Sequence, residues 1–250
     1  MKKLDPRNPP PPFIDYGLDV PSVIGTFLGG GLFLSCLGFL ASRHPLQRFS
    51  GFFLAVFFLA AGFLFLVLGF WLVWTSAKGK RLSCRRLVAG LRLKGKERVL
   101  EVGCGRGLVL IESARKLTRG RAVGLDNWSQ PYLFQNSRER TLSNARAAEV
   151  EDKVEVITGD MRKLPFSPGR FDVVVANLAL HRVKPREGRR KALREMARVL
   201  KKGGQLVLQD FLYTHQYRED LESLGLKEMK VSALSLLVFP PVRVISAVKK

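Results

Sequence analysis

The chain has 250 residues, with 42 lysines and arginines against 21 aspartates and glutamates, so its formal net charge is +21. Hydrophobic residues make up 46% and charged residues 25%, a composition that excludes disordered, collagen-like and disulfide-scaffold proteins. Twelve of the 17 phenylalanines lie before residue 75, whereas 37 of the 42 basic residues lie after it. We therefore expect an apolar N-terminal part joined to one basic soluble domain.

The first 75 residues divide into a Pro-rich leader and two uncharged runs. Residues 1–22 include four consecutive prolines and predict an extended cytoplasmic leader. As helices, the uncharged runs at 23–41 and 52–74 would be roughly 28 and 34 Å long, enough to cross a hydrocarbon core of about 30 Å. Residues 23–75 are therefore expected to form a transmembrane helical hairpin. A signal peptide is the alternative for the first run, but no small-residue cleavage pattern follows it.

A basic segment follows the second run, and residues 76–95 are predicted to be a juxtamembrane linker. Residues 78–98 contain nine lysines and arginines and one acidic residue. Near anionic lipid such a segment gains about 1 kcal/mol per basic residue, although a simple positive-inside signal is an equal alternative. Because basic residues are retained on the cytoplasmic side, we expect an integral membrane protein with its N-terminus and soluble domain in the cytoplasm.

The soluble domain, residues 96–250, alternates predicted strands and helices. Strands are expected at 98–102, 122–125, 153–157, 171–176 and 205–209, and helices at 108–117, 131–150 and 186–200. A helix at 214–224 and strands at 226–231 and 242–248 complete the chain, and the last two strands can pair antiparallel at one edge. Residues 201–204 are predicted to form the turn before the fifth strand. Repeated strand–helix units indicate an α/β fold with a doubly wound, mostly parallel sheet.

A glycine-rich loop follows the first predicted strand. Glycines at 103, 105 and 107 let bare backbone approach a ligand at a helix N-terminus. Asp126, 21 residues after Gly105 and at the tip of the next strand, is placed to accept two hydrogen bonds from a ribose diol. The dinucleotide fingerprint would need a glycine at position 108, where Leu108 stands. Glu101, just before the loop, suits a ligand with an amino end better than a pyrophosphate.

From about residue 96 to residue 210 the sequence resembles the class I S-adenosylmethionine-dependent methyltransferases, and within them the small-molecule and quinone methyltransferases. The matching segments are Val-Leu-Glu101-Val-Gly-Cys-Gly-Arg-Gly107, Val-Gly-Leu-Asp126, Thr-Gly-Asp160-Met161, Phe-Asp172-Val-Val-Val-Ala-Asn177 and Glu195-Met-Ala-Arg-Val-Leu-Lys-Lys-Gly-Gly204. The resemblance implies a seven-stranded Rossmann-like sheet, mostly parallel with an antiparallel last strand. It also implies S-adenosyl-L-methionine as the cofactor, and we expect no metal site.

The same resemblance implies the cofactor-binding residues. Glu101 and the backbone near Gly103 would face the amino-acid end of the cofactor, and Asp126 would bind its ribose. Asn177 would border the transferring methyl group. The whole implied set lies at the ends of the first four strands and in the loops that follow them: Glu101, Gly103, Cys104, Gly105, Asp126, Asn127 with Trp128 beside the adenine, Asp160 with Met161 on the adenine ring, and Asn177.

The acceptor side is less well defined by the sequence. His181 follows the fourth strand and is the best candidate for a general base, which a hydroxyl or acidic carbon needs and a thiolate often does not. A packing role is the alternative for this histidine, and His215 and Tyr213 are weaker candidates for the base. The apolar segment at 232–241 would line the acceptor pocket, touch the bilayer or pack at the strand edge.

The sequence as a whole predicts a membrane-anchored methyltransferase whose partners are the lipid bilayer and a small or lipophilic methyl acceptor. Methylation of a protein at the membrane is the first alternative. The second is a catalytically silent cofactor-fold module whose basic surface binds anionic lipid or nucleic acid. Nucleic acid is disfavoured as a partner, because no aromatic stacking platform accompanies the basic row of the helix predicted at 186–200.

Overall fold

A computed structural model of the chain describes residues 14–16, 21–43, 48–129 and 136–250. The chain divides into two compact units. The hairpin unit comprises residues 18–80, and the sheet unit comprises residues 1–17 and 81–250. The predicted leader up to residue 13 and the start of the helix predicted from residue 131 lie outside the described residues.

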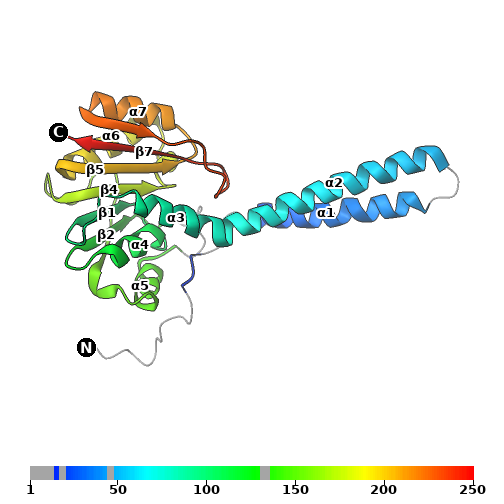
Figure 1. The fold of residues 1–250 in the computed structure, drawn as a ribbon, viewed down its shortest axis with the longest axis horizontal. Coiled ribbons are helices and arrows are strands. Elements are labelled where there is room, and N and C mark those ends of the chain that lie inside the picture. Colours follow the sequence, from blue (N-terminus) through cyan, green and yellow to red (C-terminus); the bar gives the residue numbers. More distant parts are fainter. Residues whose placement is uncertain (1–13, 17–20, 44–47, 130–135) are drawn as a thin grey trace. The chain divides into compact units, whose positions relative to one another are not determined.

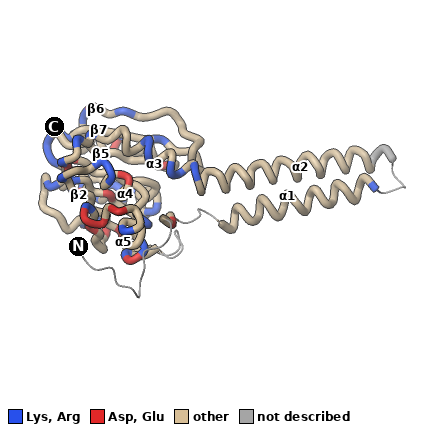
Figure 2. The backbone as a smooth tube through the Cα atoms, turned by 60° about the horizontal axis from the view of Figure 1, so that its bottom comes forward, with Lys and Arg blue, Asp and Glu red and all other residues tan. Residues whose placement is uncertain are grey.

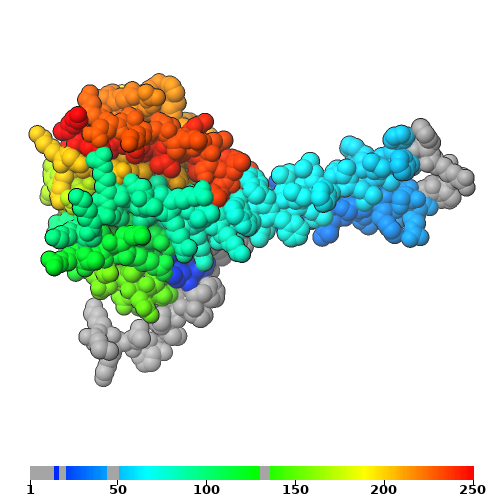
Figure 3. Space-filling view, in the orientation of Figure 1, coloured from blue at the N-terminus to red at the C-terminus, as the bar shows by residue number. Residues whose placement is uncertain are grey.

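The hairpin unit consists of two long helices that pack side by side, α1 (Pro21–Ser42) and α2 (Arg48–Trp74), followed by a π-helix at Thr75–Gly79 (Figures 1 and 3). Their backbones approach closely at small residues. A Cβ atom on Gly31 would lie 2.8 Å from the side chain of Leu66 and 3.0 Å from the carbonyl oxygen of Gly62. Such contacts between small residues are typical of helices that associate in membranes.

The outer surface of the hairpin unit is apolar. Both helices are long and apolar enough to cross a membrane, and only 17% and 11% of their most apolar windows are buried. Phe33, Phe57 and Phe63 expose 64%, 66% and 69% of their surface. Figure 2 shows no charged residue along either helix between residues 21 and 42 or between 51 and 74. Large contiguous apolar surfaces of this kind mark contact with another apolar phase or a partner.

The sheet unit is built on seven strands in the order β3-β2-β1-β4-β5-β7-β6 (Figure 1). Strands β3 to β5 in that order are parallel, and β7 is antiparallel to both β5 and β6. The predicted mixed Rossmann-like sheet with an antiparallel last strand is therefore confirmed. The strands are β1 (Arg98–Val102), β2 (Arg121–Asp126), β3 (Val154–Thr158), β4 (Phe171–Asn177), β5 (Leu200–Asp210), β6 (Leu226–Val231) and β7 (Arg243–Lys249).

Helices cover both faces of the sheet because alternate strand residues are apolar on both sides. Val99 belongs to the core beneath one face and Leu100 to the core beneath the other. The first face is covered by α3 (Lys80–Ala89), α4 (Leu108–Lys116) and α5 (Arg138–Ala147), and the second by α6 (Arg186–Val199) and α7 (Thr214–Ser223). Short 3-10 turns lie at Glu151–Lys153 and Leu180–Arg182.

Two segments differ from what the sequence pattern suggested. Part of the predicted basic linker is helix α3, whose buried residues Cys84, Leu87 and Val88 join the core of the sheet unit. The predicted turn at 201–204 is wrong as a strand boundary, because β5 already begins at Leu200. Leu200 pairs with Phe171 and Gln205 with Val173, so the extra residues of β5 form a bulge within the strand.

Candidate functional site

The predicted site residues lie at or just after the carboxyl ends of β1 to β5. Because these strands are parallel, their carboxyl ends meet at one edge of the sheet, which we call the carboxyl edge. The opposite, amino edge carries the starts of the same strands. In open α/β sheets ligands bind at the carboxyl edge, where the strand order reverses. Here that reversal lies between β1 and β4. Strands β2 and β3 lie beyond β1 on one side of the sheet, and β5 to β7 lie beyond β4 on the other.

The glycine loop after β1 is held by hydrogen bonds to β2. The amides of Gly103 and Cys104 donate to the carbonyl oxygen of Leu125 over 2.7 and 3.1 Å, and Gly105 N donates to Asp126 Oδ2 over 2.8 Å. Gly103 has a φ of +76°, and a Cβ atom there would overlap the Cβ of Ala179 in the loop after β4. The loops after β1 and β4 therefore pack directly against each other because Gly103 has no side chain.

Gly103→Ala should lower cofactor affinity, because the loop must move away from Ala179. The left-handed backbone alone costs a non-glycine residue roughly 1–2 kcal/mol. Gly169→Ala is the matched control, since Gly169 also has a positive φ of +63° but has open space around its Cβ position. Thermal unfolding should show destabilisation in both variants, whereas calorimetry should show a large loss of binding only for Gly103→Ala. Equal affinity in the two variants would contradict this role of the loop.

Glu101, at the end of β1, has a structural contact that the sequence did not suggest. Its side chain is buried, and its Oε2 accepts a hydrogen bond from Leu110 N over 2.7 Å. That amide lies in the first turn of α4, where backbone N–H groups have no partner within the helix. Burial raises the pKa of Glu101 well above that of an exposed glutamate. The contact of Glu101 with the cofactor stays a prediction.

Glu101→Gln should stabilise the protein increasingly as pH rises. A carboxyl group whose pKa is raised in the folded state holds its proton longer there than in the unfolded chain, so the wild type loses stability as pH rises above the ordinary value of 4.5. The amide keeps an acceptor for Leu110 N and cannot ionise. We expect a gain of about 1 kcal/mol or more at neutral pH and almost none at pH 4, because one pKa unit corresponds to 1.36 kcal/mol.

The measurement is chemical unfolding of the detergent-solubilised chain from pH 4 to pH 8. Glu155→Gln is its control, since it changes an exposed carboxyl group on β3. A constant difference between Glu101→Gln and wild type over this range would show that Glu101 is ionised in the folded protein.

Asp126 organises the loops around it. Its Oδ1 accepts from Trp128 N over 2.7 Å and from the Asn136 side chain over 3.3 Å, in addition to the bond from Gly105 N to Oδ2. A carboxylate accepts about four hydrogen bonds, so capacity remains for a hydroxyl group. Asn127 is exposed, and the Trp128 indole is fixed by a 2.7 Å hydrogen bond to Thr158.

The loop after β3 carries the acid assigned to the adenine. Asp160 is half-exposed, and its carboxylate binds the Arg162 guanidinium and backbone N–H at 2.6–3.0 Å. The hydrogen bonds from Arg162 lower the pKa of Asp160. Met161 approaches the glycine loop, with its Cε 3.6 Å from the Cβ position of Gly103. Asp160 must therefore share its carboxylate with Arg162 if it also accepts from an adenine.

Asn177 and Cys104 differ in what they offer at the carboxyl edge. The Oδ1 atom of Asn177, at the end of β4, is buried and has no hydrogen-bond partner among the residues that the structure describes. An orphaned acceptor at this position is suited to a donor on a bound ligand. The Cys104 thiol is buried against Gly124, and burial raises its pKa. Cys104 can therefore contribute through its backbone only.

His181 forms a cluster with residues that the sequence did not single out. Its Nδ1 lies 2.8 Å from Oδ1 of Asp210, and its backbone N donates to Oδ2 of the same carboxylate over 3.1 Å. The ring must rotate to straighten the Nδ1 contact into a hydrogen bond. The hydroxyl of Tyr217 donates to Asp210 over 3.4 Å. Asp210 ends β5 and is 2% exposed, so this acid faces the loop that carries His181.

The other acceptor-side candidates are differently placed. His215 is 87% exposed and pairs with Glu219 at 3.2 Å on the surface of α7. Tyr213 has its ring 3.8 Å from the guanidinium carbon of Arg189. His181 therefore lies beside a buried acid, Asp210, whereas the acid beside His215 is half-exposed.

A short N-terminal segment also reaches the glycine loop. Asp15 Oδ2 lies 2.7 Å from Nη1 of Arg106, whose side chain is only 5% exposed. The backbone N and O of Asp15 both bond to the side chain of Asn144 in α5, and Tyr16 is buried beside them. Burial raises the pKa of Tyr16. Residues of the predicted leader therefore help to hold the loop that follows β1.

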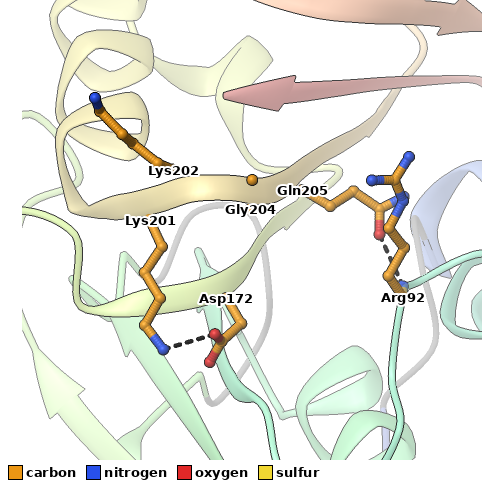
Figure 4. Close-up of a pocket in the computed structure, with 7 residues that line it drawn as sticks. Arg92, Asp172, Lys201, Lys202, Gly204 and Gln205 are labelled. Atoms are coloured by element: carbon orange, nitrogen blue, oxygen red, sulfur yellow. Dashed lines mark hydrogen bonds and ion pairs between the residues drawn. The ribbon is translucent and has the colours of Figure 1, made fainter. Parts of the chain in front are cut away.

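A pocket at the amino edge has a different character (Figure 4). Two of its three cationic residues pair with acids: Lys201 Nζ lies 2.6 Å from Asp172, and Arg92 pairs with Glu228 at 3.1 Å. The pocket lies at the amino edge of the sheet, whereas His181 and Asp126 lie at the carboxyl edge. Across the residues that the structure describes, no group of three or more potential metal ligands is present.

The comparisons with known proteins agree with this geometry. Residues 100–208 match a family model described as a methyltransferase domain. The chain is 35% identical over 127 residues to 27-O-demethylrifamycin SV methyltransferase of Amycolatopsis mediterranei, covering 51% of this chain and 43% of that protein. It is 29% identical over 132 residues to the ubiquinone/menaquinone biosynthesis C-methyltransferase UbiE of Roseobacter denitrificans, covering 52% and 49%. The chain thus spans less than half the length of these relatives.

A solved structure is similar in fold. Geranyl diphosphate C-methyltransferase from Streptomyces coelicolor, determined with Mg²⁺, geranyl diphosphate and S-adenosyl-L-homocysteine, superposes with a TM-score of 0.56 at 16% identity. The match covers 68% of this chain and 79% of that one.

Proposed function

We propose that this chain, which carries a class I S-adenosylmethionine-dependent methyltransferase domain, is anchored in a membrane by α1 and α2 and methylates a small or lipophilic acceptor. The observation that carries this proposal is the convergence of the glycine loop, Asp126, Asn177 and the His181–Asp210 pair at the carboxyl edge.

S-adenosylmethionine is the cofactor of this domain, and the residues at the carboxyl edge fit it. Asp126 has remaining acceptor capacity for one ribose hydroxyl, and the orphaned Oδ1 of Asn177 fits the amino group of the cofactor's methionine part. The bare backbone of Gly103 and Gly105 allows close approach. Trp128, held by Thr158, supports the adenine side.

The cofactor supplies an electrophilic methyl group on its sulfonium, so the protein must mainly align the acceptor and exclude water. His181 would take the proton from an acceptor hydroxyl or acidic carbon at Nε2. Asp210 faces Nδ1 and would stabilise the imidazolium that results. The ring centre of Phe211 lies 4.5 Å from that of His181, so the two rings pack against each other.

Support for the membrane anchor comes from the two apolar helices and from the basic residues that follow them. Most of the surface of α1 and α2 is exposed, whereas a core helix of a soluble protein would be buried. Basic residues after α2 favour a cytoplasmic position of the sheet unit and of the N-terminus. A relative named for quinone biosynthesis supports a lipophilic acceptor.

The test uses the full chain, purified in detergent. Calorimetry should detect binding of both S-adenosylmethionine and S-adenosylhomocysteine. The chain is then incubated with a cell extract and S-adenosylmethionine that carries a tritiated methyl group, and the extract is fractionated. The label should appear in the lipid or small-molecule fraction. Label in the protein fraction alone would favour protein methylation at the membrane. Failure of the folded chain to bind the cofactor would favour the silent module instead.

A further inference from the structure

The segment between β6 and β7 exposes large apolar side chains at the carboxyl edge. Leu234 and Leu236 expose 52% and 60% of their surface, and Leu212, which follows β5, exposes 42%. Arg243, the first residue of β7, pairs in register with Asp210, so the segment ends beside the cluster of His181. In Figure 3 residues 232–242, orange to red, lie at the surface of the sheet unit.

This segment, residues 232–242, is an ordered ribbon. Ser235 and Val242 exchange two backbone hydrogen bonds of 2.8 and 3.0 Å, and Ser232 N donates to Val244 O over 2.8 Å. Val242 is buried and anchors the ribbon to the core. Leu234 and Leu236 are two residues apart and so lie on the same side of an extended chain. Their exposure is therefore fixed by local structure.

The chain also enters the sheet unit at the carboxyl edge. Ser83, in the first turn of α3, hydrogen bonds over 3.0 Å to Gln209 at the carboxyl end of β5. Gln205, earlier in β5, instead accepts from Arg92 N beyond the end of α3. Helix α3 therefore runs antiparallel to β5 and begins at the carboxyl edge, as Figure 1 also shows.

The N-terminal segment of the sheet unit, residues 14–16, also lies at the carboxyl edge. Arg81 donates to the carbonyl oxygen of Ile14 over 3.3 Å and covers the ring of Tyr16. Asp15, between them, binds Arg106 in the glycine loop. Tyr16, the last described residue before the apolar hairpin, and Arg81, the first residue of the sheet unit after it, therefore both lie at the carboxyl edge.

We propose that the ribbon 232–242 and Leu212 form a lipid-contacting surface, which holds the carboxyl edge against an anionic bilayer so that the acceptor enters from the membrane. The inference rests on the proposed function and identifies the side from which the acceptor arrives. Apolar side chains beside cations are the composition of interfacial segments. The exposed Arg81, near the start of α3, and Arg243, the first residue of β7, supply cations at this edge.

The test places a fluorescent probe on the ribbon of the full chain in vesicles of phosphatidylcholine and phosphatidylglycerol. The probe is attached at Leu236→Cys in a Cys36→Ala background, because Cys84 and Cys104 are buried. Lys202→Cys, at the amino edge, is the matched control. Nitroxide lipids should quench the probe at residue 236, at a depth of roughly 5–10 Å, and leave the probe at 202 unquenched. Aqueous iodide should show the reverse.

Equal access of iodide to both probes would overturn the proposal. A probe at residue 236 that is shielded from iodide and from nitroxide lipid alike would report a second protein copy on the ribbon and would overturn it as well. Calorimetry with S-adenosylmethionine on the same labelled samples separates the two proposals. Retained cofactor binding with an iodide-accessible ribbon would reject the lipid-contacting surface and leave the proposed function standing.

Discussion

Asp126→Ala should lower the affinity for S-adenosylmethionine by at least about 10-fold. The proposed contact to the ribose is one hydrogen bond to a charged carboxylate, worth about 1.5–3 kcal/mol. Since a tenfold change in affinity corresponds to 1.4 kcal/mol, its loss lowers the affinity by roughly 10- to 100-fold. The substitution also removes the acceptor for Gly105 N and Trp128 N, so the glycine loop loses its link to β2. Calorimetry on the full chain measures the affinity directly.

Asp172→Ala is the matched control for this experiment. Asp172 also accepts a backbone hydrogen bond, from Arg98 N over 2.8 Å, and pairs with Lys201, but it lies at the amino edge of the sheet. Both variants should lower the thermal midpoint, because each leaves polar groups without a partner. Only Asp126→Ala should lose the cofactor. Similar affinity in both variants would remove Asp126 from the cofactor site.

The sequence was sufficient for the sheet because its strands are short apolar runs that glycine and polar residues separate. The predicted strands at 98–102 and 226–231 have the observed bounds, and the one at 171–176 ends one residue early. Helix α3 was hidden within a basic segment, although its buried residues 84, 87 and 88 follow a helical spacing. The high positive charge of the segment predicted contact with lipid, whereas the apolar face of the helix consists of only a few residues.

The site was less predictable, because its contacts join residues far apart in the chain. Asp210 lies 29 residues after His181, and Arg106 lies 91 residues after Asp15. No local spacing reveals such pairs. A family motif points to the glycine loop and to Asp126, whereas a buried acid behind a histidine depends on how β4 and β5 align. The register between β4 and β5 determines whether these two residues meet, and that register is known only from the folded chain.

His181→Gln should lower kcat by roughly 10²- to 10⁴-fold if the acceptor is a hydroxyl or an acidic carbon, the range that a positioned general base contributes. Asp210→Asn should lower kcat by roughly 10- to 100-fold, because a hydrogen bond to a charged group is worth about 1.5–3 kcal/mol and each 1.36 kcal/mol is a factor of ten in rate. In both variants cofactor affinity should stay unchanged, since the polar contacts of the His181 and Asp210 side chains in the described residues reach neither Asp126 nor the glycine loop. Steady-state kinetics with the labelled acceptor separates kcat from KM.

His215→Gln controls for the loss of an imidazole, since His215 is exposed on α7 and pairs only with a surface glutamate in the described part of the chain. Added imidazole should restore part of the activity of His181→Gln and none of the loss in Asp210→Asn, because a free base can replace a missing ring but not a missing charge behind it. Full activity of His181→Gln would show that the acceptor needs no base. The acceptor would then be a thiolate or a neutral amine, and His181 would serve to pack the loop against Phe211.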